Sequence, residues 1–332
     1  MTDPLGAQSA TRSWPGVSVV MPVLNEERHL RAAVRSVLDQ DYPGEIEVVL
    51  ALGPSRDKTD QVAAALAADA RVRTVPSPTG RTPNALNLAI AASNHTVIAR
   101  VDGHSLLPPG YLRRAVELLD ETGADNVGGL MSARGVTDFE QAVAHAMTSR
   151  IGVGNAPFHV GGAEGPADTV YLGVFRRAAL ERVGGYDESF ARAQDWEMNF
   201  RIRESGGLVW FSPTLSVSYR PRSSLRLLAR QYFHYGRWRR HVVRTHRGSV
   251  NLRYLAPPAA LLGVVAGIVL STFLTLWGLT LPLGYLALVA GGAVAVGRGL
   301  PLRAKLIEPV VLVTMHMSWG AGFLTSWRPV EE

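Results

Sequence analysis

Two short acidic segments, about ninety residues apart, carry the side chains of this chain that could do chemistry. Asp102 and His104 stand two positions apart directly after an apolar stretch, residues 96–101, that is predicted as a strand. The carboxyl end of such a strand is where an open α/β sheet presents ligands to a bound nucleotide. Asp195 opens a predicted helix, where the helix dipole favours an ionised carboxylate. One segment could hold a metal diphosphate and the other could accept a proton, which indicates group transfer from an activated donor.

The elements that must position these segments alternate between strand and helix. Apolar runs predict strands at residues 17–21, 46–52, 72–75 and 96–101, with helices at 30–38, 59–70 and 83–92 between them. Later segments predict a helix at 109–121, a strand at 126–131, a glycine-rich loop at 152–165 and a strand at 169–175. Strands that alternate with helices imply parallel pairing in a doubly wound sheet. The pattern predicts a nucleotide-binding first half and an acceptor-binding second half.

The net charge of +6 is concentrated in one segment of the 332 residues. Residues 220–253 contain ten arginines and no acidic residue, so +6 less +10 leaves −4 for the rest of the chain. A local basic belt beside apolar segments is typical of the cytoplasmic face of an anionic membrane, and it argues against a nucleic-acid partner. The alternative is a solvated, arginine-rich helix face. The chain has no cysteine, which excludes disulfides and thiolate chemistry.

The C-terminal part of the chain is strongly apolar. Residues 257–277 carry no charge and are long enough to cross a hydrocarbon core of about 30 Å. Residues 283–296 are also uncharged and lead to a basic loop, so the two segments predict a membrane hairpin with a cytoplasmic return. A third apolar run, residues 310–327, either spans the membrane or lies against the hairpin. The sequence therefore predicts two or three spans.

Four motifs carry a family resemblance. They read VVMPVLNEE at residues 19–27, ALN at 85–87, RVDGH at 100–104 and QDWEMNFR at 194–201. Together they resemble the family 2 inverting glycosyltransferases with a GT-A fold. The subgroup they resemble most is the membrane-anchored type of succinoglycan and other exopolysaccharide biosynthesis, which carries Asp-x-His where most relatives have Asp-x-Asp. The aromatic and basic helix of that subgroup reads RQYFHYGRW here, at residues 230–238.

The resemblance divides the chain into four parts. Residues 1–16 form a polar, disordered tail without a signal peptide. Residues 17–221 form a cytoplasmic catalytic domain of the α/β class, a Rossmann-like GT-A fold with a mostly parallel sheet and flanking helices. Residues 222–254 form a basic, aromatic interfacial helix region, and residues 255–328 a transmembrane helical region. The expected location is the inner or plasma membrane.

The resemblance also implies roles for particular residues. Asp195 is the expected general base, which takes the proton of the acceptor hydroxyl, although Asp also often serves as a helix N-cap. Asp102 is the expected ligand of Mn²⁺ or Mg²⁺, with His104 as a second ligand or a diphosphate contact. The expected contacts to a UDP- or GDP-sugar donor are Pro22, Asn25, Glu26, Asp57, Arg81, Asn87 and Asp102. The candidates for the acceptor side are Asp168, Gln194, Glu197, Gln231, Arg237 and Trp238.

Two departures from the family pattern bear on function. The loop after the second strand usually supplies an acid for the nucleoside, whereas the first carboxylate here is Asp57. Five residues separate Gln231 from Arg237, so the strict Gln-x-x-Arg-Trp element of processive synthases is absent and we expect one sugar per encounter. The expected acceptor is lipid-linked, at a membrane surface. The alternatives are direct transfer onto polyprenyl phosphate and a catalytically silent membrane scaffold.

Overall fold

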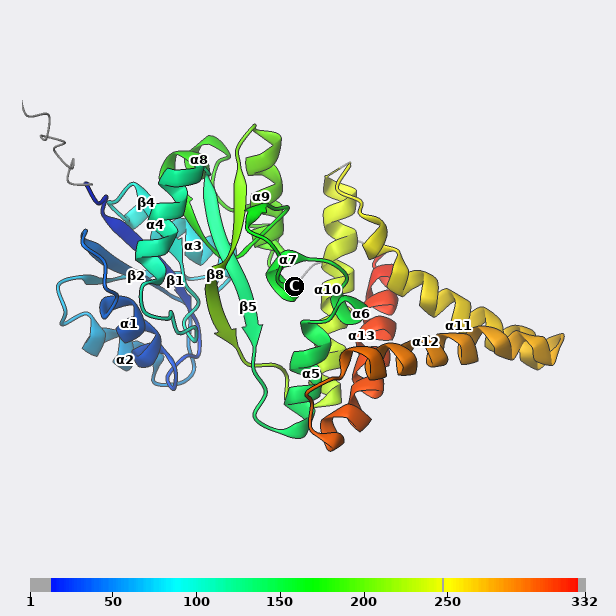
Figure 1. The fold of residues 1–332 in the computed structure, drawn as a ribbon. Helices are drawn as coiled ribbons and strands as arrows, with labels where there is room; N and C mark the ends of the chain where they lie inside the picture. Colours follow the sequence, from blue (N-terminus) through cyan, green and yellow to red (C-terminus); the bar gives the residue numbers. More distant parts are fainter. Residues whose placement is uncertain (1–12, 247, 328–332) are drawn as a thin grey trace, which may run out of the picture.

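The structure is a computed structural model that describes residues 13–246 and 248–327 (Figure 1). Most of the predicted tail, residues 1–12, lies outside the described residues. Trp14 is described, and its ring meets the ring of Tyr42 edge-on at 5.4 Å between centroids. The packed part of the chain therefore begins within the segment that was predicted as tail.

A single mixed sheet forms the centre of the N-terminal domain. Its strands are β1 (Val17–Val23), β2 (Ile46–Leu52), β3 (Val72–Pro76), β4 (Val97–Arg100), β5 (Asn126–Ala133), β6 (Gly165–Pro166), β7 (Tyr171–Arg176) and β8 (Val209–Tyr219). Their order is β3-β2-β1-β4-β7-β5-β8-β6. The strands β1 to β4 are mutually parallel, and so are β5 and β8, whereas β7 is antiparallel to both of its neighbours. The predicted mostly parallel sheet is confirmed.

The register of β1 against β4 brings two functional loops to one edge. Val20 lies opposite Arg100, and the backbone N–H of Val101 donates to the carbonyl oxygen of Val20 at 3.1 Å. Because both strands run in the same direction, the loops that follow them emerge side by side. One loop begins at Leu24 and the other at Asp102, so the sheet places the first two motifs together.

Helices cover both faces of this sheet (Figure 1). One face packs against α1 (Leu30–Leu38), α2 (Thr59–Leu66) and α4 (Tyr111–Thr122), and the other against α3 (Thr82–Ala92), α8 (Arg177–Arg182) and α9 (Gln194–Glu204). Successive strand side chains point to opposite faces, so Val19 belongs to the first core and Val20 to the second. A strand buried on both faces reads as a continuous apolar run, which is how β1 appears in the sequence.

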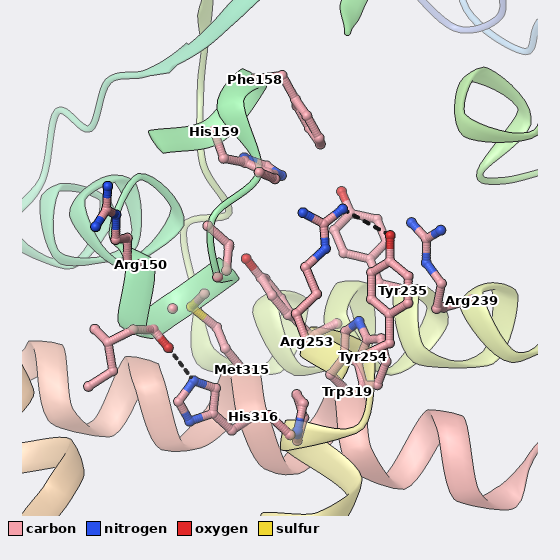
Figure 2. Close-up of a pocket in the computed structure, with 18 of the residues that line it drawn as sticks. Arg150, Phe158, His159, Tyr235, Arg239, Arg253, Tyr254, Met315, His316 and Trp319 are labelled. Carbon is pink, nitrogen blue, oxygen red and sulfur yellow. Dashed lines mark hydrogen bonds between the residues drawn. The ribbon is translucent and has the colours of Figure 1, made fainter. Parts of the chain in front are cut away.

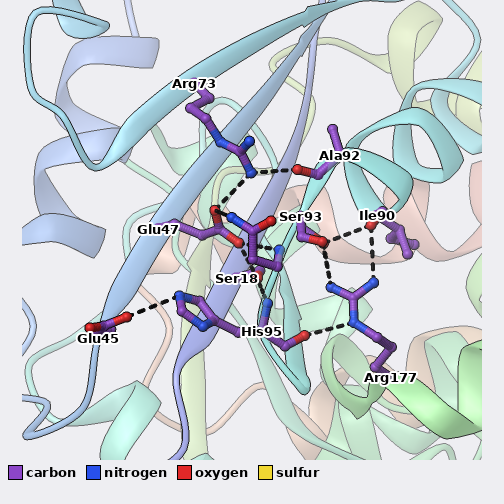
Figure 3. Close-up of polar contacts among 10 residues, drawn as sticks. Ser18, Glu45, Glu47, Arg73, Ile90, Ala92, Ser93, His95 and Arg177 are labelled. Carbon is purple, nitrogen blue, oxygen red and sulfur yellow. Dashed lines mark hydrogen bonds and ion pairs between the residues drawn. The ribbon is translucent and has the colours of Figure 1, made fainter.

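The amino-terminal edge of the sheet is tied by buried polar contacts (Figure 3). The hydroxyl of Ser18 donates to Glu47 at 2.6 Å and accepts the backbone N–H of His95 at 3.0 Å. Burial alone would raise the pKa of Glu47, but bonds from Ser18, the Asn94 backbone and Arg73 hold that pKa below its ordinary value. The network links β1, β2 and the entry to β4, and leaves the opposite edge of the sheet for chemistry.

Several predicted boundaries differ from the structure. The second helix ends at Leu66 rather than at residue 70, and β7 begins at Tyr171 rather than at residue 169. The predicted loop at 152–165 contains part of α6 (Arg150–Val153) and all of α7 (Pro157–Val160). The strand β8 was not predicted. Its residues include Pro213 and several serines, and its register with β5 shifts between Gly128 and Leu130, so no regular alternation marks it.

A helical layer joins the sheet domain to the apolar tail. It contains α5 (Asp138–Met147) and α10 (Leu225–Thr245), followed by the short 3₁₀ helix η1 (Leu252–Tyr254). Helix α10 packs closely on α13 (Leu302–Thr325). The contact is so close that a Cβ on Gly236 would collide with the carbonyl oxygen of Trp319. Within the predicted interfacial helix region, residues 222–254, the structure thus has the long helix α10, which rests on the apolar helix α13, and then η1.

Three helices are long and apolar enough to cross a membrane. The candidate spans are Leu252–Phe273, Leu276–Val296 and Leu302–Thr325, with mean hydropathies of 1.9, 1.9 and 1.2. They contain α11 (Ala256–Phe273), η2 (Leu276–Leu279), α12 (Thr280–Val296) and α13. The hairpin of α11 and α12 projects away from the sheet domain, while α13 lies against α10 (Figure 1). The sequence predicts two or three spans, and the described residues contain three candidate spans.

Candidate active site

Arg100, the last residue of β4, joins the two acids that the sequence separates by more than ninety positions. Its Nη2 donates to Oδ1 of Asp102 at 3.0 Å, and its Nη1 contacts Oδ1 of Asp195. Only 6% of the Arg100 side chain is exposed, against 21% for Asp102 and 34% for Asp195. The buried guanidinium therefore holds both carboxylates at one place, with each still open on its other side.

The charge of Asp195 is held in an unusual environment. Burial raises its pKa above the ordinary value for an aspartate, and the nearby Asp102 adds to this, while Arg100 acts in the opposite direction. A carboxylate with a raised pKa is a stronger base than an exposed aspartate. Asp195 can therefore accept a proton more readily than most aspartates.

The local backbone explains how Asp195 is presented. It is the second residue of α9, and the helix is preceded by Ala193 in a left-handed conformation at φ 60°. Ala193, not Asp195, is the N-cap, so the capping alternative for Asp195 is wrong. Instead Asp195 lies in the first turn, where the helix dipole favours its ionised form against the cost of burial.

The loops that follow β1 and β2 bind each other through side chains. Ser55 accepts the backbone N–H of Asn25 at 3.0 Å, and the Asn25 side-chain oxygen accepts the N–H of Arg56 at 2.8 Å. Asp57 accepts the backbone N–H groups of Glu27 at 3.2 Å and Thr59 at 3.0 Å. The Thr59 hydroxyl also donates to Asp57. This bond has the largest effect among those that lower the pKa of Asp57, and the backbone bonds add to it. Asn25 and Asp57 thus shape the loops of the predicted donor side, and Pro22 lies in β1 just before them.

His104 does not stand free beside Asp102. Its Nδ1 lies 2.7 Å from Oε1 of Glu26, a contact that raises the pKa of His104. Because Glu26 engages Nδ1, Nε2 is the ring nitrogen that His104 could offer to a metal ion or to a diphosphate oxygen. In the described part of the chain, no group of three or more His, Cys, Asp or Glu residues could hold a metal ion. A metal ion at Asp102 would therefore need further ligands, such as the phosphate oxygens of a donor, to complete its coordination sphere.

Asn87 and Arg81 of the predicted donor set differ in their contacts. The side chain of Asn87 donates to the carbonyl oxygen of Tyr186 at 2.8 Å and accepts the N–H of Tyr186 at 2.8 Å. It therefore braces the loop that leads to α9. Arg81 is exposed at the N-terminus of α3, and its backbone N–H donates to Thr79 at 3.2 Å.

Replacement of Asn87 should reduce stability. Asn87→Ala leaves both backbone groups of Tyr186 without their partner, at a cost of about 1–3 kcal/mol. Thermal unfolding of the purified protein measures the loss. The matched control is Asn84→Ala in the same helix, whose side chain donates to the exposed Glu188 at 3.0 Å, and we expect it to have a smaller effect. Equal unfolding temperatures for Asn87→Ala and the unchanged protein would contradict the bracing role.

A cavity of about 580 Å³ opens beside Asp195 (Figure 2). Its walls come from the loops around α6 and α7, from α10, and from α11, α12 and α13. Asp195 lines it, whereas Asp102 does not. Arg100 thus links Asp195, which lines the cavity, to Asp102, which does not.

Of the predicted acceptor residues, one lines this cavity and the others do not. Trp238 lines it, with 2% of its area exposed. Glu197 is buried but forms an ion pair with Arg201 at 2.6 Å, as its spacing of one helical turn suggested. Gln231 donates to the hydroxyl groups of Tyr219 at 3.0 Å and Tyr235 at 2.7 Å. Asp168, Gln194 and Arg237 are not among the residues that line the cavity.

The arginine that organises the site was not predicted from the sequence. Arg100 opens the motif RVDGH at residues 100–104, and the family resemblance implies no role for it. A charged residue at the end of an otherwise apolar strand is nevertheless a detectable signal. Buried charges are rare unless they are paired, so a partner could have been expected. Arg239 and Arg253, which line the cavity, lie in a generally basic segment, where no local pattern distinguishes them.

Comparisons with known proteins agree with this architecture. A family model described as glycosyl transferase family 2 matches residues 18–184. The succinoglycan biosynthesis protein ExoA of Rhizobium meliloti (strain 1021) is 33% identical over 318 residues, which cover 93% of each chain. A dolichyl N-acetyl-alpha-D-glucosaminyl phosphate 3-beta-D-2,3-diacetamido-2,3-dideoxy-beta-D-glucuronosyltransferase of Methanococcus voltae is 24% identical over 251 residues, which cover 73% of this chain and 77% of the relative.

Two solved structures share the fold. The mannosyltransferase PcManGT from Pyrobaculum calidifontis, in complex with GDP-Man and Mn²⁺, has a TM-score of 0.61 at 19% identity, over 96% of this chain and 91% of that chain. S. aureus TarS 1-349 has a TM-score of 0.51 at 14% identity, over 93% of this chain and 90% of that one. Together with the family model and the 33% identical relative, the mixed sheet and its flanking helices show that this chain belongs to glycosyl transferase family 2 and has the GT-A fold.

Proposed function

We propose that this protein is a membrane-bound, inverting glycosyltransferase that moves a sugar from a UDP- or GDP-sugar to a polyprenyl-linked acceptor in cell-surface polysaccharide or glycolipid synthesis. The observation that carries the proposal is the placement of Arg100 between Asp102 and Asp195. Asp195 lines the cavity, whereas Asp102 follows β4 beside the loop after β1, and both carboxylates contact the same buried cation. Such a division suits a direct displacement in which donor and acceptor approach from different sides.

The proposed chemistry needs a base on the acceptor side. As the acceptor oxygen attacks the anomeric carbon, Asp195 takes the hydroxyl proton, and the bond to the nucleoside diphosphate breaks. Attack opposite the leaving group inverts the anomeric configuration. Arg100 keeps Asp195 oriented toward the cavity.

A divalent cation fits the donor side. Mn²⁺ or Mg²⁺ would neutralise the charge that develops on the leaving diphosphate. The bonds from Arg100 to Asp102 involve Oδ1, so Oδ2 is the oxygen that Asp102 would offer to the cation. The mannosyltransferase of Pyrobaculum calidifontis was solved in complex with GDP-Man and Mn²⁺, which supports the same pairing here.

The membrane placement rests on the three apolar helices and on relatives. The exposed apolar surface of α11 and α12 suits lipid, and the arginines of α10 suit an anionic cytoplasmic face. We therefore place the catalytic domain on the cytoplasmic side of the cell membrane. The name of the Methanococcus voltae relative specifies a dolichyl-linked sugar phosphate for that protein, and ExoA is named for succinoglycan biosynthesis. The first name supports a lipid-linked acceptor, and the second supports a role in polysaccharide synthesis.

A transfer assay tests the proposal. The purified full-length chain is incubated with Mn²⁺, a membrane lipid extract and radiolabelled UDP- or GDP-sugars in turn. We expect label from one donor to enter the organic phase. Product of a size that corresponds to polyprenyl monophosphate with one sugar would instead favour direct transfer onto polyprenyl phosphate. Failure of every donor to label lipid would contradict the proposal.

Metal removal should abolish most of the activity. Chelation with EDTA is expected to lower the initial transfer rate on the order of 100-fold, because charge on the leaving diphosphate is then uncompensated. Readdition of Mn²⁺ in excess should restore the rate, which excludes irreversible damage. An unchanged rate after chelation would show that the transfer needs no metal.

A further inference from the structure

The lining of the cavity beside Asp195 contains more cationic than anionic side chains. Its lining contains four arginines, Arg150, Arg192, Arg239 and Arg253, whereas Asp195 is the one carboxylate among the described lining residues. In Figure 2 the guanidinium groups of Arg253 and Arg239 lie on either side of the Tyr254 ring, with the His159 ring toward Arg253, while Arg150 lies apart. Arg239 and Arg253 are partly buried, whereas Arg150 and Arg192 are exposed. Two partly buried cations on one wall favour an anionic occupant, because burial of a charge is costly without a partner.

Arg239 is held in place by two aromatic rings. Its guanidinium carbon lies 4.7 Å from the ring centroid of Trp196 and 4.3 Å from that of Tyr254. The two rings fix the plane of the group, but its Nη1 is buried and has no hydrogen-bond partner among the described residues. A planar guanidinium with an unused, preorganised donor is suited to a phosphate oxygen.

Arg253 and His159 extend this group. Arg253 donates from Nη2 to the Tyr254 hydroxyl at 2.9 Å, and its guanidinium carbon lies 5.0 Å from the centroid of the Tyr254 ring, which Arg239 also contacts. Burial, with a smaller contribution from Arg253, lowers the pKa of His159 to about 3, so the ring is neutral. Its Nδ1 is buried and has no partner among the described residues. The wall thus offers two cations and a neutral ring nitrogen, which matches an anionic group with several oxygens.

The cavity continues into an apolar groove between α11 and α12. Ala260, Tyr285 and Leu288 line both the cavity and this groove, whose further walls are Gly263, Val264, Thr280, Leu281 and Gly284. The groove lies within two of the candidate membrane spans. Arg253 stands at the start of the first span, which is the depth at which a lipid headgroup lies. A charged chamber that leads into an apolar groove fits a molecule with a phosphate head and a hydrocarbon tail.

We propose that Arg239, Arg253 and His159 form the phosphate subsite for the lipid carrier of the acceptor, and that the groove between α11 and α12 holds the first isoprene units. This inference rests on the proposed function, since it names the part of the acceptor that this chain grips. The phosphate lies against the cationic wall, and the acceptor sugar projects toward Asp195 in the same cavity. The chain therefore selects its acceptor by the carrier as well as by the sugar.

Direct binding of a short lipid diphosphate tests the subsite. Full-length protein in detergent is titrated by calorimetry with farnesyl diphosphate, farnesol and inorganic pyrophosphate, with UDP and GDP at saturation to block the donor site. We expect farnesyl diphosphate to bind more tightly than either fragment. Equal affinity for pyrophosphate would indicate a site for free phosphates, and equal affinity for farnesol would indicate an apolar groove alone. Either result would overturn the proposal.

Variants separate the head from the tail. Arg239→Gln and Arg253→Gln should each weaken farnesyl diphosphate binding on the order of 10- to 100-fold, because each removes a charge-assisted bond. Arg230→Gln, on an exposed part of α10 away from the cavity, is the matched control and should bind normally. Normal affinity in both cavity variants would overturn the proposal.

A second pair of variants tests the groove and does not depend on correct folding of the arginine variants. Gly284→Leu fills the groove, where a Cβ meets nothing within 4 Å, and should weaken farnesyl diphosphate but not pyrophosphate binding. Gly291→Leu in the same helix also has open space but lies outside the groove, so it should bind like the unchanged protein. An unaffected Gly284→Leu would overturn the tail assignment.

The transfer assay keeps this inference distinct from the proposed function. If no donor labels lipid but farnesyl diphosphate still binds in an Arg239-dependent way, the proposed function fails and the subsite stands. If lipid is labelled but the affinity of the variants is unchanged, the subsite fails and the proposed function stands. In active variants the subsite predicts a raised KM for the lipid acceptor with an unchanged KM for the donor.

Discussion

Asp195→Asn is expected to lower the rate of sugar transfer by about 10²- to 10⁴-fold, the range that a positioned general base contributes. The amide has almost the same shape but cannot take the hydroxyl proton. Asp195 lies in the first turn of α9 and lines the cavity, whereas Asp102 does not line it. The measurement is the single-turnover rate with donor and lipid extract at saturation.

The control for this variant is Asp60→Asn. Asp60 also lies in the first turn of a helix, α2, but it is exposed and does not line the cavity, so its loss should change the rate by no more than about twofold, as for most surface substitutions. Near-normal transfer by Asp195→Asn, or an equal loss in both variants, would contradict the role of Asp195 as the base.

Arg100→Gln should have the largest effect on stability. The substitution removes the buried cation and leaves two partly buried carboxylates facing each other without compensation. Loss of one partner of a buried pair costs about 3–5 kcal/mol, and the partial exposure of Asp102 and Asp195 favours the lower end, about 3 kcal/mol. Chemical or thermal unfolding followed by circular dichroism measures this loss, and transfer should fall together with it.

Arg113→Gln is a matched comparison for Arg100→Gln. Arg113 also pairs with an aspartate, Asp41, at 2.9 Å, but 81% of the Asp41 side chain is exposed. Exposed pairs contribute about 0–1 kcal/mol, so this variant should unfold almost like the unchanged protein. If Arg100→Gln were as mild as Arg113→Gln, Arg100 would not be the cation that holds the two acids together.

The sequence predicted the first half of the fold well because local patterns determine it. The strands β1 to β4 are short apolar runs, and α1 has its apolar residues on one face, so each element is visible in a window of a few residues. In contrast, β8 includes Pro213 and alternates poorly, since its pairing with β5 is interrupted. Its place in the sheet depends on a partner that lies about eighty residues away in the chain.

The two acids of the candidate site could be predicted from the sequence, but their connection through Arg100 could not. Asp102 follows a strand and Asp195 begins a helix, and both positions are readable from local sequence. The convergence of the two acids depends on the packing of α9 against the sheet, which no local pattern specifies. The cavity wall shows the same limit, because the face of α10 that carries Arg239 is determined by the close contact of Gly236 with α13.

The central claim is that Asp102 serves the donor and Asp195 serves the acceptor. Calorimetric titration of the nucleoside diphosphate with Mn²⁺ into Asp102→Asn and Asp195→Asn tests this division most directly. We predict that Asp102→Asn loses most of its affinity for the nucleotide, while Asp195→Asn binds it as the unchanged protein does. Equal affinities in the two variants, or a loss confined to Asp195→Asn, would contradict the division.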